Sequence, residues 1–173
     1  MNIKEALTSY FLKLRGLYKK MFNSLPTISW SPELNQQLFE GKPDEDGEIQ
    51  WKTAEATQII MDGLCKELQN FYSSYYYWEL RGKYKGILFD FPPVPSLDAA
   101  KSIVSTAIHD GGYYFPKQET VLLATCTSSG NDDLLLFYRQ NTGKLFIYDV
   151  DKRFVIPLEY SLTELLGSME AVI

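Results

Sequence analysis

The chain has 173 residues, 45% apolar and 23% charged, a composition typical of one globular domain rather than of a disordered or fibrous protein. Its formal net charge is −5, with +4 on residues 1–23 and −9 on the remainder. An acidic body disfavours nucleic acid, whose phosphates require lysine and arginine, and favours a basic protein partner.

No stretch approaches the roughly 18 consecutive apolar residues of a transmembrane helix, and no signal-peptide pattern opens the chain. Cys65 and Cys126 each lie in an apolar run, without metal-ligand spacing. We therefore expect buried free thiols in a reducing compartment, and hence a cytoplasmic protein.

Residues 3–22 are predicted to form an amphipathic helix, because apolar side chains such as Ile3, Leu7, Tyr10 and Phe11 recur at three- and four-residue steps. Pro26 is expected to end it. The polar face is basic. It fits either the solvated face of a core-packing helix or a face that contacts a membrane surface or a partner.

Residues 24–48 are rich in Pro, Ser, Asn, Gly and acids and are predicted to form an extended loop. The loop ends in four carboxylates within five residues: Asp44, Glu45, Asp46 and Glu48. Such a cluster repels itself, so it faces water or meets a cationic partner. These four residues, which we call the acidic segment, are the predicted partner-binding site, and a solvated loop that touches nothing is the alternative.

Residues 49–51 are predicted to form a short strand after the acidic segment, with Ile49 and Trp51 on one face and directed into the core. A second helix is expected to begin near Thr53. Its apolar face would contain Ala56, Ile60, Leu64, Leu68, Phe71 and Tyr75.

Two strands, 75–80 and 86–91, are predicted to form a hairpin that turns at Gly82 and Lys83. Three prolines at positions 92, 93 and 95 then break the chain. A third helix is expected from Ser96 or Asp98 to about His109, closed by the glycines at 111 and 112.

The last third is predicted to be mainly strand, over residues 120–125, 133–140, 144–150 and 154–158, with Pro157 tolerated on an edge strand. Ser161 is expected to cap a final helix over 162–170. Together these elements predict a single α+β domain over residues 1–173. Its sheet should have about four to six strands, mainly antiparallel, with helices packed on it.

The motifs of catalytic and metal sites do not fit this chain. An EF-hand register over the acidic segment would place Lys42 at the first ligand position and Thr53 at the last, where carboxylates are needed. His109, the only histidine, precedes Asp110 at a predicted helix end, where a cation is stabilised anyway. No phosphate-binding glycine motif is present. We therefore predict a non-enzymatic protein without metal or cofactor, and a hydrolase with clustered carboxylates remains an alternative.

A series of short motifs in fixed order resembles the Syd family, the bacterial SecY-interacting proteins of the wider SUKH superfamily. The motifs span nearly the whole chain, and their order and spacing carry the resemblance. They are Tyr10-Phe11, Gly47-Glu48-Ile49-Gln50-Trp51, Phe71-Tyr72-Ser73-Ser74, Ser96-Leu97-Asp98, Ile108-His109, Val121-Leu122-Leu123-Ala124, Asn141-Thr142-Gly143-Lys144 and Ser161-Leu162-Thr163-Glu164-Leu165-Leu166.

The resemblance implies an α+β domain with a concave acidic surface that docks on basic cytoplasmic loops of the SecY channel. Membrane association would then occur only through a protein partner, at the cytoplasmic face of the inner membrane. The superfamily also contains immunity proteins that neutralise toxins, often nucleases, so a basic cognate toxin is the alternative partner. Of the family's features, only the acidic segment is carried over to residues of this chain, as candidate contacts.

Overall fold

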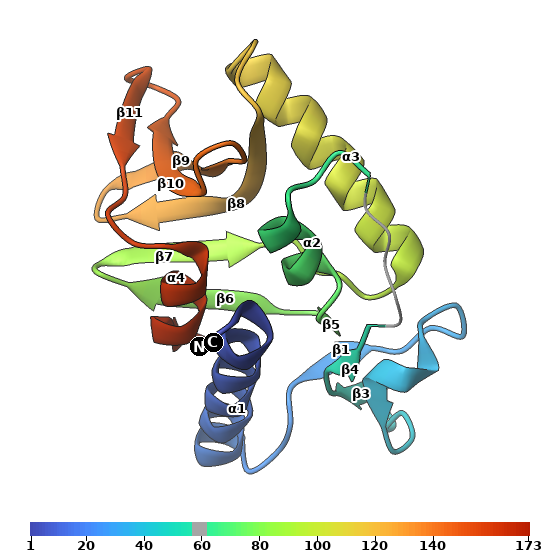
Figure 1. The fold of residues 1–173 in the computed structure, drawn as a ribbon. Helices are drawn as coiled ribbons and strands as arrows, with labels where there is room; N and C mark the ends of the chain where they lie inside the picture. The colour runs from blue at the N-terminus through green and yellow to red at the C-terminus, as the bar shows by residue number, and fades with distance from the viewer. Residues whose placement is uncertain (57–61) are drawn as a thin grey trace.

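The computed structural model describes residues 1–56 and 62–173. Within these two ranges the fold has four α-helices and a large antiparallel sheet, so the predicted α+β class is confirmed (Figure 1). The helices are α1 (Ile3–Phe22), α2 (Lys66–Tyr72), α3 (Leu97–Tyr114) and α4 (Leu162–Ser168). None of these helices is both long enough and apolar enough to cross a membrane.

The main sheet in the described ranges has seven strands in the order β11-β10-β9-β8-β7-β6-β12, one more than the largest number predicted. All neighbouring strands in it run antiparallel. Its members are β6 (Leu80–Tyr84), β7 (Ile87–Phe91), β8 (Thr120–Ser128), β9 (Asn131–Arg139), β10 (Lys144–Asp149), β11 (Phe154–Pro157) and β12 (Glu170–Ala171).

Two small sheets accompany the main one. The first has the order β1-β3-β2 and the second pairs β4 with β5. Their strands are β1 (Thr27–Ser29), β2 (Phe39–Glu40), β3 (Glu48–Trp51), β4 (Ala54–Glu55) and β5 (Tyr75–Tyr76), and a short 3-10 helix, η1 (Gln36–Leu38), precedes β2.

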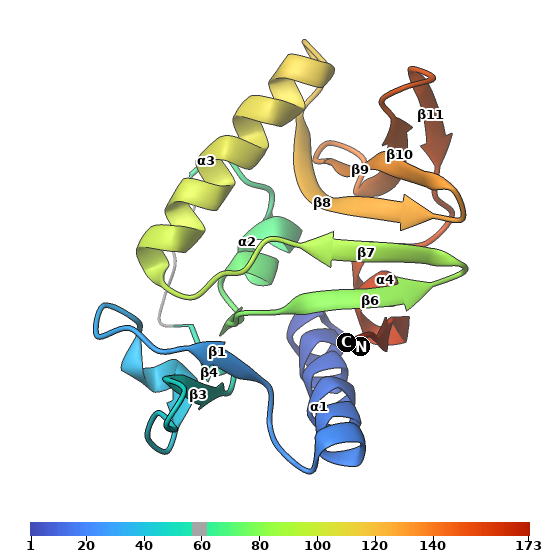
Figure 2. The same ribbon diagram turned by 180° about the vertical axis from the view of Figure 1, so that it is seen from behind.

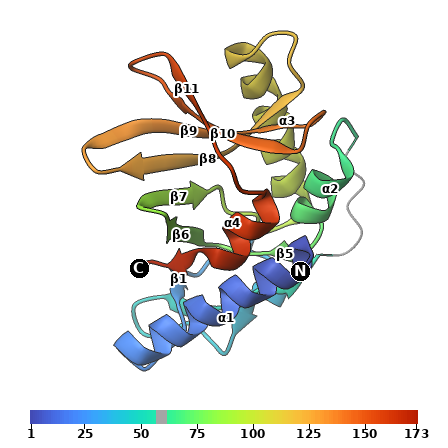
Figure 3. The ribbon, with the colours of Figure 1, turned by 60° about the vertical axis from the view of Figure 1, so that its left-hand side comes forward.

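Helices α1, α2 and α4 lie on one face of the main sheet, in front of it in Figure 1 and behind it in Figure 2. Figure 3 shows α1 and α4 running side by side, and α3 stands apart from them beside β8. The buried apolar side chains form one connected cluster that takes in all four helices and the main sheet.

Helix α1 forms where it was predicted, from residue 3 to residue 22. Asn2 and Glu5 form a reciprocal capping box at its start, and Asn23 in the left-handed region ends it. The Tyr10 hydroxyl donates 2.6 Å to the Arg81 carbonyl and accepts 2.9 Å from the Arg81 amide, which ties the helix to β6. The core-packing interpretation of this helix is therefore correct for its first four turns.

In the middle of the chain, the predicted start of the second helix and the predicted hairpin turn are wrong. Residues 54–55 pair with β5 as a strand, so no helix begins at Thr53, and α2 begins at residue 66. Ile60, assigned to that helix face, lies outside the described residues. The hairpin between β6 and β7 turns at Lys85 and Gly86, whose backbone φ angles of 48° and 83° suit such a turn, and not at Gly82.

Helix α3 begins after Ser96 as predicted but continues through both glycines to residue 114. His109 therefore lies inside the helix rather than at its end, and its predicted role at a helix terminus is wrong. In the last third, the strands and the final helix form within about two or three residues of the predicted ranges.

Ile49 and Trp51 are 3% and 4% exposed, so the prediction that both point into the core is confirmed. The Trp51 amide donates to the Pro26 carbonyl at 2.9 Å, and the neighbouring Lys52 amide donates to Leu38 at 2.8 Å. The strand thus fixes the small sheet, and the acidic segment before it, to the body of the protein.

Candidate functional site

A groove opens where β7 and β8 separate. The two strands pair from Leu88 opposite Thr127 to Asp90 opposite Thr125, and the pairing stops there. The chain continues from Phe91 into Pro92 and Pro93, whose nitrogens carry no hydrogen and cannot donate to a ladder. Strand β7 therefore turns away from β8 toward α3.

Strand β8 bends at the same level. Leu122 pairs with Phe137 and Ala124 pairs with Leu136, so Leu123 is an extra residue that forms a β-bulge. A bulge bends its strand and increases the local twist. As a result the first half of β8 runs beside α3 and the second half runs beside β7, as Figure 2 shows.

Helix α3 forms the opposite wall of the groove. It is held to the start of β8 by Thr120, whose side-chain hydroxyl donates to the Gly111 carbonyl at 2.9 Å. The capped N-terminus of the helix lies at the other end, where the Ser96 side chain accepts from the Ala99 amide at 3.2 Å. Hydrogen bonds therefore fix both ends of this helix, one within its first turn and one to β8.

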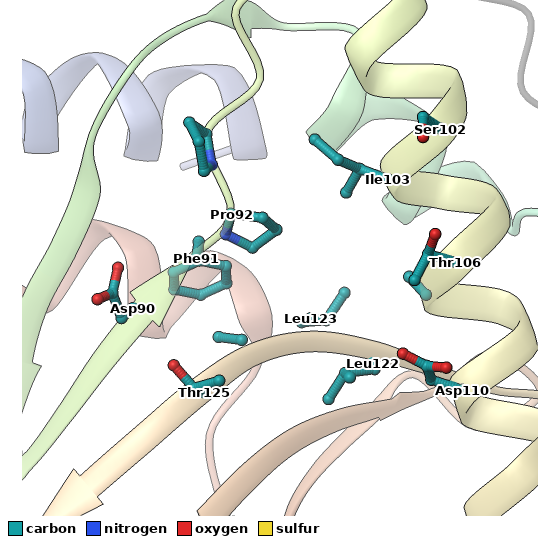
Figure 4. Close-up of a pocket in the computed structure, with 13 residues that line it drawn as sticks. Asp90, Phe91, Pro92, Ser102, Ile103, Thr106, Asp110, Leu122, Leu123 and Thr125 are labelled. Atoms are coloured by element: carbon teal, nitrogen blue, oxygen red, sulfur yellow. The ribbon is translucent and has the colours of Figure 1, made fainter.

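The groove has a volume of about 440 Å³ and is mostly apolar. Its apolar lining includes Phe91, Pro92, Ile103, Leu122 and Leu123, with hydroxyl groups from Ser102, Thr106 and Thr125 among them (Figure 4). A concave, largely apolar cavity with a few polar groups is the usual form of a binding site.

The charged residues that line the groove are both acidic, Asp90 on β7 and Asp110 on α3. Asp90 lies 3.7 Å from the Arg81 guanidinium, and Asp110 lies 3.2 Å from the ring of His109. These two partners sit outside the lining, and among the described residues no lysine or arginine side chain is part of it. A ligand in the groove therefore meets an apolar floor with a carboxylate near each end.

The acidic segment lies elsewhere, between β2 and the start of β3, and none of its four residues lines the groove. Asp44 is committed to the loop itself, because its Oδ1 accepts the backbone N–H groups of Asp46 at 3.0 Å and Glu48 at 2.8 Å. Glu48 is half-buried and accepts from the Ser29 hydroxyl at 2.5 Å. Glu45 and Asp46 are exposed, and within residues 1–56 and 62–173 their carboxylates form no ion pair or side-chain hydrogen bond.

Asp44 and Glu48 do come together with Glu40 around a shallow hollow of about 280 Å³ that also includes Lys42. Glu45 and Asp46 do not line it. In the ranges 1–56 and 62–173, no group of three His, Cys, Asp or Glu side chains is placed to hold a metal ion. The hollow thus brings three carboxylates and one ammonium group together.

A comparison of the chain with protein-family models found no match, and a comparison with curated proteins also found none.

The groove was missed at the level of the sequence because its walls come from residues 90–93, 102–110 and 122–125, which only the fold brings together. One signal was present. Three prolines within four residues after a predicted strand mean that this strand cannot keep its place in a ladder, so a neighbouring strand is left without a partner.

Proposed function

We propose that this protein is a binding protein that acts without catalysis and takes a basic segment of a protein partner into the groove between α3, β7 and β8. The acidic segment, and above all Glu45 and Asp46, forms a second contact that attracts the same partner by charge. The groove would then determine which partner is bound, and the exposed carboxylates would increase the association rate.

The charge of the groove supports this proposal most directly. Its apolar floor lies between Asp90 and Asp110, and the described lining contains no cation, so a segment with apolar residues between basic ones is the complementary ligand. The net charge of −9 outside residues 1–23 acts in the same direction, because it attracts basic partners over a longer range.

The resemblance to the Syd family makes the basic cytoplasmic loops of SecY the leading candidate partner. The protein would then work in the cytoplasm, at the face of the inner membrane, and reach that membrane only through the channel. A basic toxin, the partner of the superfamily's immunity proteins, would suit the same groove.

Binding to synthetic peptides that cover each basic SecY loop tests the proposal. Fluorescence anisotropy or calorimetry would compare the wild-type protein with Thr106→Arg, which places a bulky cation in the groove. The matched control is Ser105→Arg, because Ser105 is the next residue on α3, is also exposed, and does not line the groove.

We expect Thr106→Arg to weaken binding of the loop peptide about tenfold or more, and Ser105→Arg to change it by less than about twofold. Circular dichroism would confirm that both variants keep the fold. Equal affinity of the two variants would show that the groove is not the site. If no SecY loop peptide binds but a basic toxin binds through the groove, the protein would be an immunity protein rather than a SecY-binding protein.

A further inference from the structure

We infer that the groove binds its partner as an extended strand that pairs with the backbone of Leu122 on the open edge of β8. This inference rests on the proposed function, since it specifies how the same groove holds a basic segment. It concerns the backbone of the ligand as well as its charge, and so it makes a different prediction from charge complementarity alone.

The direction of the Leu122 backbone follows from the pairing of β8 with β9. The Gln140 amide donates to the Glu119 carbonyl at 2.7 Å, which makes these two residues a hydrogen-bonded pair. In an antiparallel ladder such pairs alternate, so the N–H and C=O of Val121 face β9 and those of Leu122 face the opposite edge. That edge of β8 borders the groove.

The backbone groups of Leu122 have no partner there among the described residues. Strand β7 pairs with β8 only as far as Thr125, and no turn or loop hydrogen bond involves Leu122. The residue is half-buried, and its side chain is part of the groove wall (Figure 4). A half-buried, unpaired donor and acceptor on a strand edge is a ready template for another extended chain.

The neighbouring residues confine this open edge to a short stretch. At one end, the Thr120 amide already donates to Gln118 at 2.8 Å, and its hydroxyl is bonded to Gly111. At the other end, Thr125 is already opposite Asp90 of β7. A ligand residue opposite Leu122 could exchange two hydrogen bonds with it, which a helical ligand could not do because its backbone groups are used internally.

The two aspartates set the spacing of the ligand's charges. Asp90 lies opposite Thr125 and Asp110 precedes Gly111, which contacts Thr120, so the carboxylates flank about five residues of β8. At roughly 3.3 Å per residue this is a span of about 16 Å. Side chains on one face of a strand are an even number of residues apart, so the complementary ligand is an extended segment with two long basic side chains four positions apart and small or β-branched residues between them.

The test uses a blocked octapeptide with lysines at its second and sixth positions, which lie on one face of an extended chain, and alternating valine and threonine between them. A second peptide has the same sequence with every backbone nitrogen between the lysines methylated, which removes the N–H donors and keeps the charge and the apolar surface. A third carries glutamate in place of both lysines. Affinity is measured by calorimetry, and the protein's backbone amides are followed by NMR.

We expect the first peptide to bind and the methylated peptide to bind about tenfold more weakly or not at all. The Leu122 amide signal should shift and exchange with solvent more slowly on binding, whereas the Val121 amide, which faces β9, should keep its exchange rate. The glutamate peptide should not bind, and Thr106→Arg should abolish the effect on Leu122.

Equal binding of the methylated and unmethylated peptides would overturn strand pairing while leaving the groove as a site for basic segments, so the proposed function would stand. Binding without any change at the Leu122 amide would overturn the inference in the same way. Absence of binding by the first peptide, in a protein that binds a SecY loop through the groove, would show that the partner is held in another conformation.

Discussion

Thr120 and Gly111 approach so closely that no side chain could fit between them. A Cβ atom built on Gly111 would lie 2.0 Å from the carbonyl oxygen of Thr120, well inside van der Waals contact. The Thr120 hydroxyl returns a 2.9 Å hydrogen bond to the Gly111 carbonyl. This contact sets the distance between α3 and β8 at one end of the groove, so glycine at position 111 is a requirement of the site.

Gly111→Ala is therefore expected to destabilise the protein by about 3 kcal/mol, because the methyl group meets backbone that cannot move without shifting β8. Gly112→Ala is the matched control. Among the described residues, nothing outside the local helix backbone lies within 4 Å of its added Cβ, and alanine in a helix interior is favoured over glycine by about 0.5–1 kcal/mol. Denaturant unfolding of both variants measures the difference, and similar stabilities would contradict the close contact.

Trp51→Ala is expected to reduce the free energy of unfolding by about 3–5 kcal/mol, the usual cost of removing a buried aromatic side chain. Trp30→Ala provides the comparison, because Trp30 is 42% exposed and should cost far less. Chemical denaturation followed by circular dichroism reports both values. A Trp51→Ala variant as stable as the wild type would mean that β3 does not anchor the small sheet.

Because of Asp149, the protein is expected to lose stability at acid pH. It is 3% exposed, and its side chain accepts a hydrogen bond from the Lys152 backbone N–H at 2.9 Å. This bond is the main cause that lowers the pKa of Asp149, and hydrogen bonds from the Lys152 ammonium and the Asn131 side-chain amide lower it further. A lowered pKa means that the ionised form stabilises the fold. This contribution is complete above about pH 5 and is lost as the pH falls through the folded-state pKa.

Asp149→Asn is accordingly expected to be less stable than the wild type at pH 7, with the difference shrinking steadily below about pH 4. Melting temperatures of both proteins over this range give the result. A difference that stays constant with pH would show that the charge of Asp149 contributes nothing and that only its hydrogen-bond geometry matters.

The two thiols are expected to differ in reactivity. Cys126 is 2% exposed, and burial raises its pKa to about 12, so almost no thiolate forms at neutral pH. Cys65 is partly exposed at the start of α2. A thiol reagent should label Cys65 in the native protein and Cys126 only after unfolding, which mass spectrometry of peptides can distinguish. Equal labelling rates in the native state would contradict the buried position of Cys126.

The exposed part of the acidic segment is expected to act on the rate of association. Glu45→Lys combined with Asp46→Lys should slow binding of the SecY loop peptide and reduce its dependence on salt, because exposed charges act mainly through steering. Asp44 and Glu48 are left unchanged, since their carboxylates hold the loop. Stopped-flow measurements at low and high salt give the association rates of both proteins. Unchanged rates would show that the acidic segment is a solvated loop that does not contact the partner.

How much the sequence revealed depended on whether the determining contacts were local. Helix α1 was predicted to the residue because its apolar positions repeat at helical spacing, and the structure shows that Asn2, Glu5 and Asn23 cap it at those ends. The helix expected from Thr53 was wrong because residues 54–55 pair with residues 75–76, a partner that periodicity cannot reveal. Helix α3 was predicted to close at Gly111, but it continues through this residue, which packs against the distant Thr120.

In the candidate site, too, local features could be predicted from the sequence and those that depend on distant contacts could not. The acidic segment was visible as a run of charges, yet the structure alone separates Asp44 and Glu48, which hold the loop, from Glu45 and Asp46, which do not. The groove depends on where β7 leaves β8 and on the bulge at Leu123, and both are properties of strand pairing.

The outermost strand, β11, gives the sheet an edge that resists assembly. Leu158 donates to the Leu145 carbonyl at 3.1 Å, so by alternation the backbone of Pro157 faces away from β10, where its ring leaves no donor for an incoming chain. Phe154, Val155 and Ile156 are exposed on this strand, a composition that invites aggregation. Restoring the missing donor by Pro157→Val should therefore promote concentration-dependent fibres, which makes this proline a safeguard of solubility.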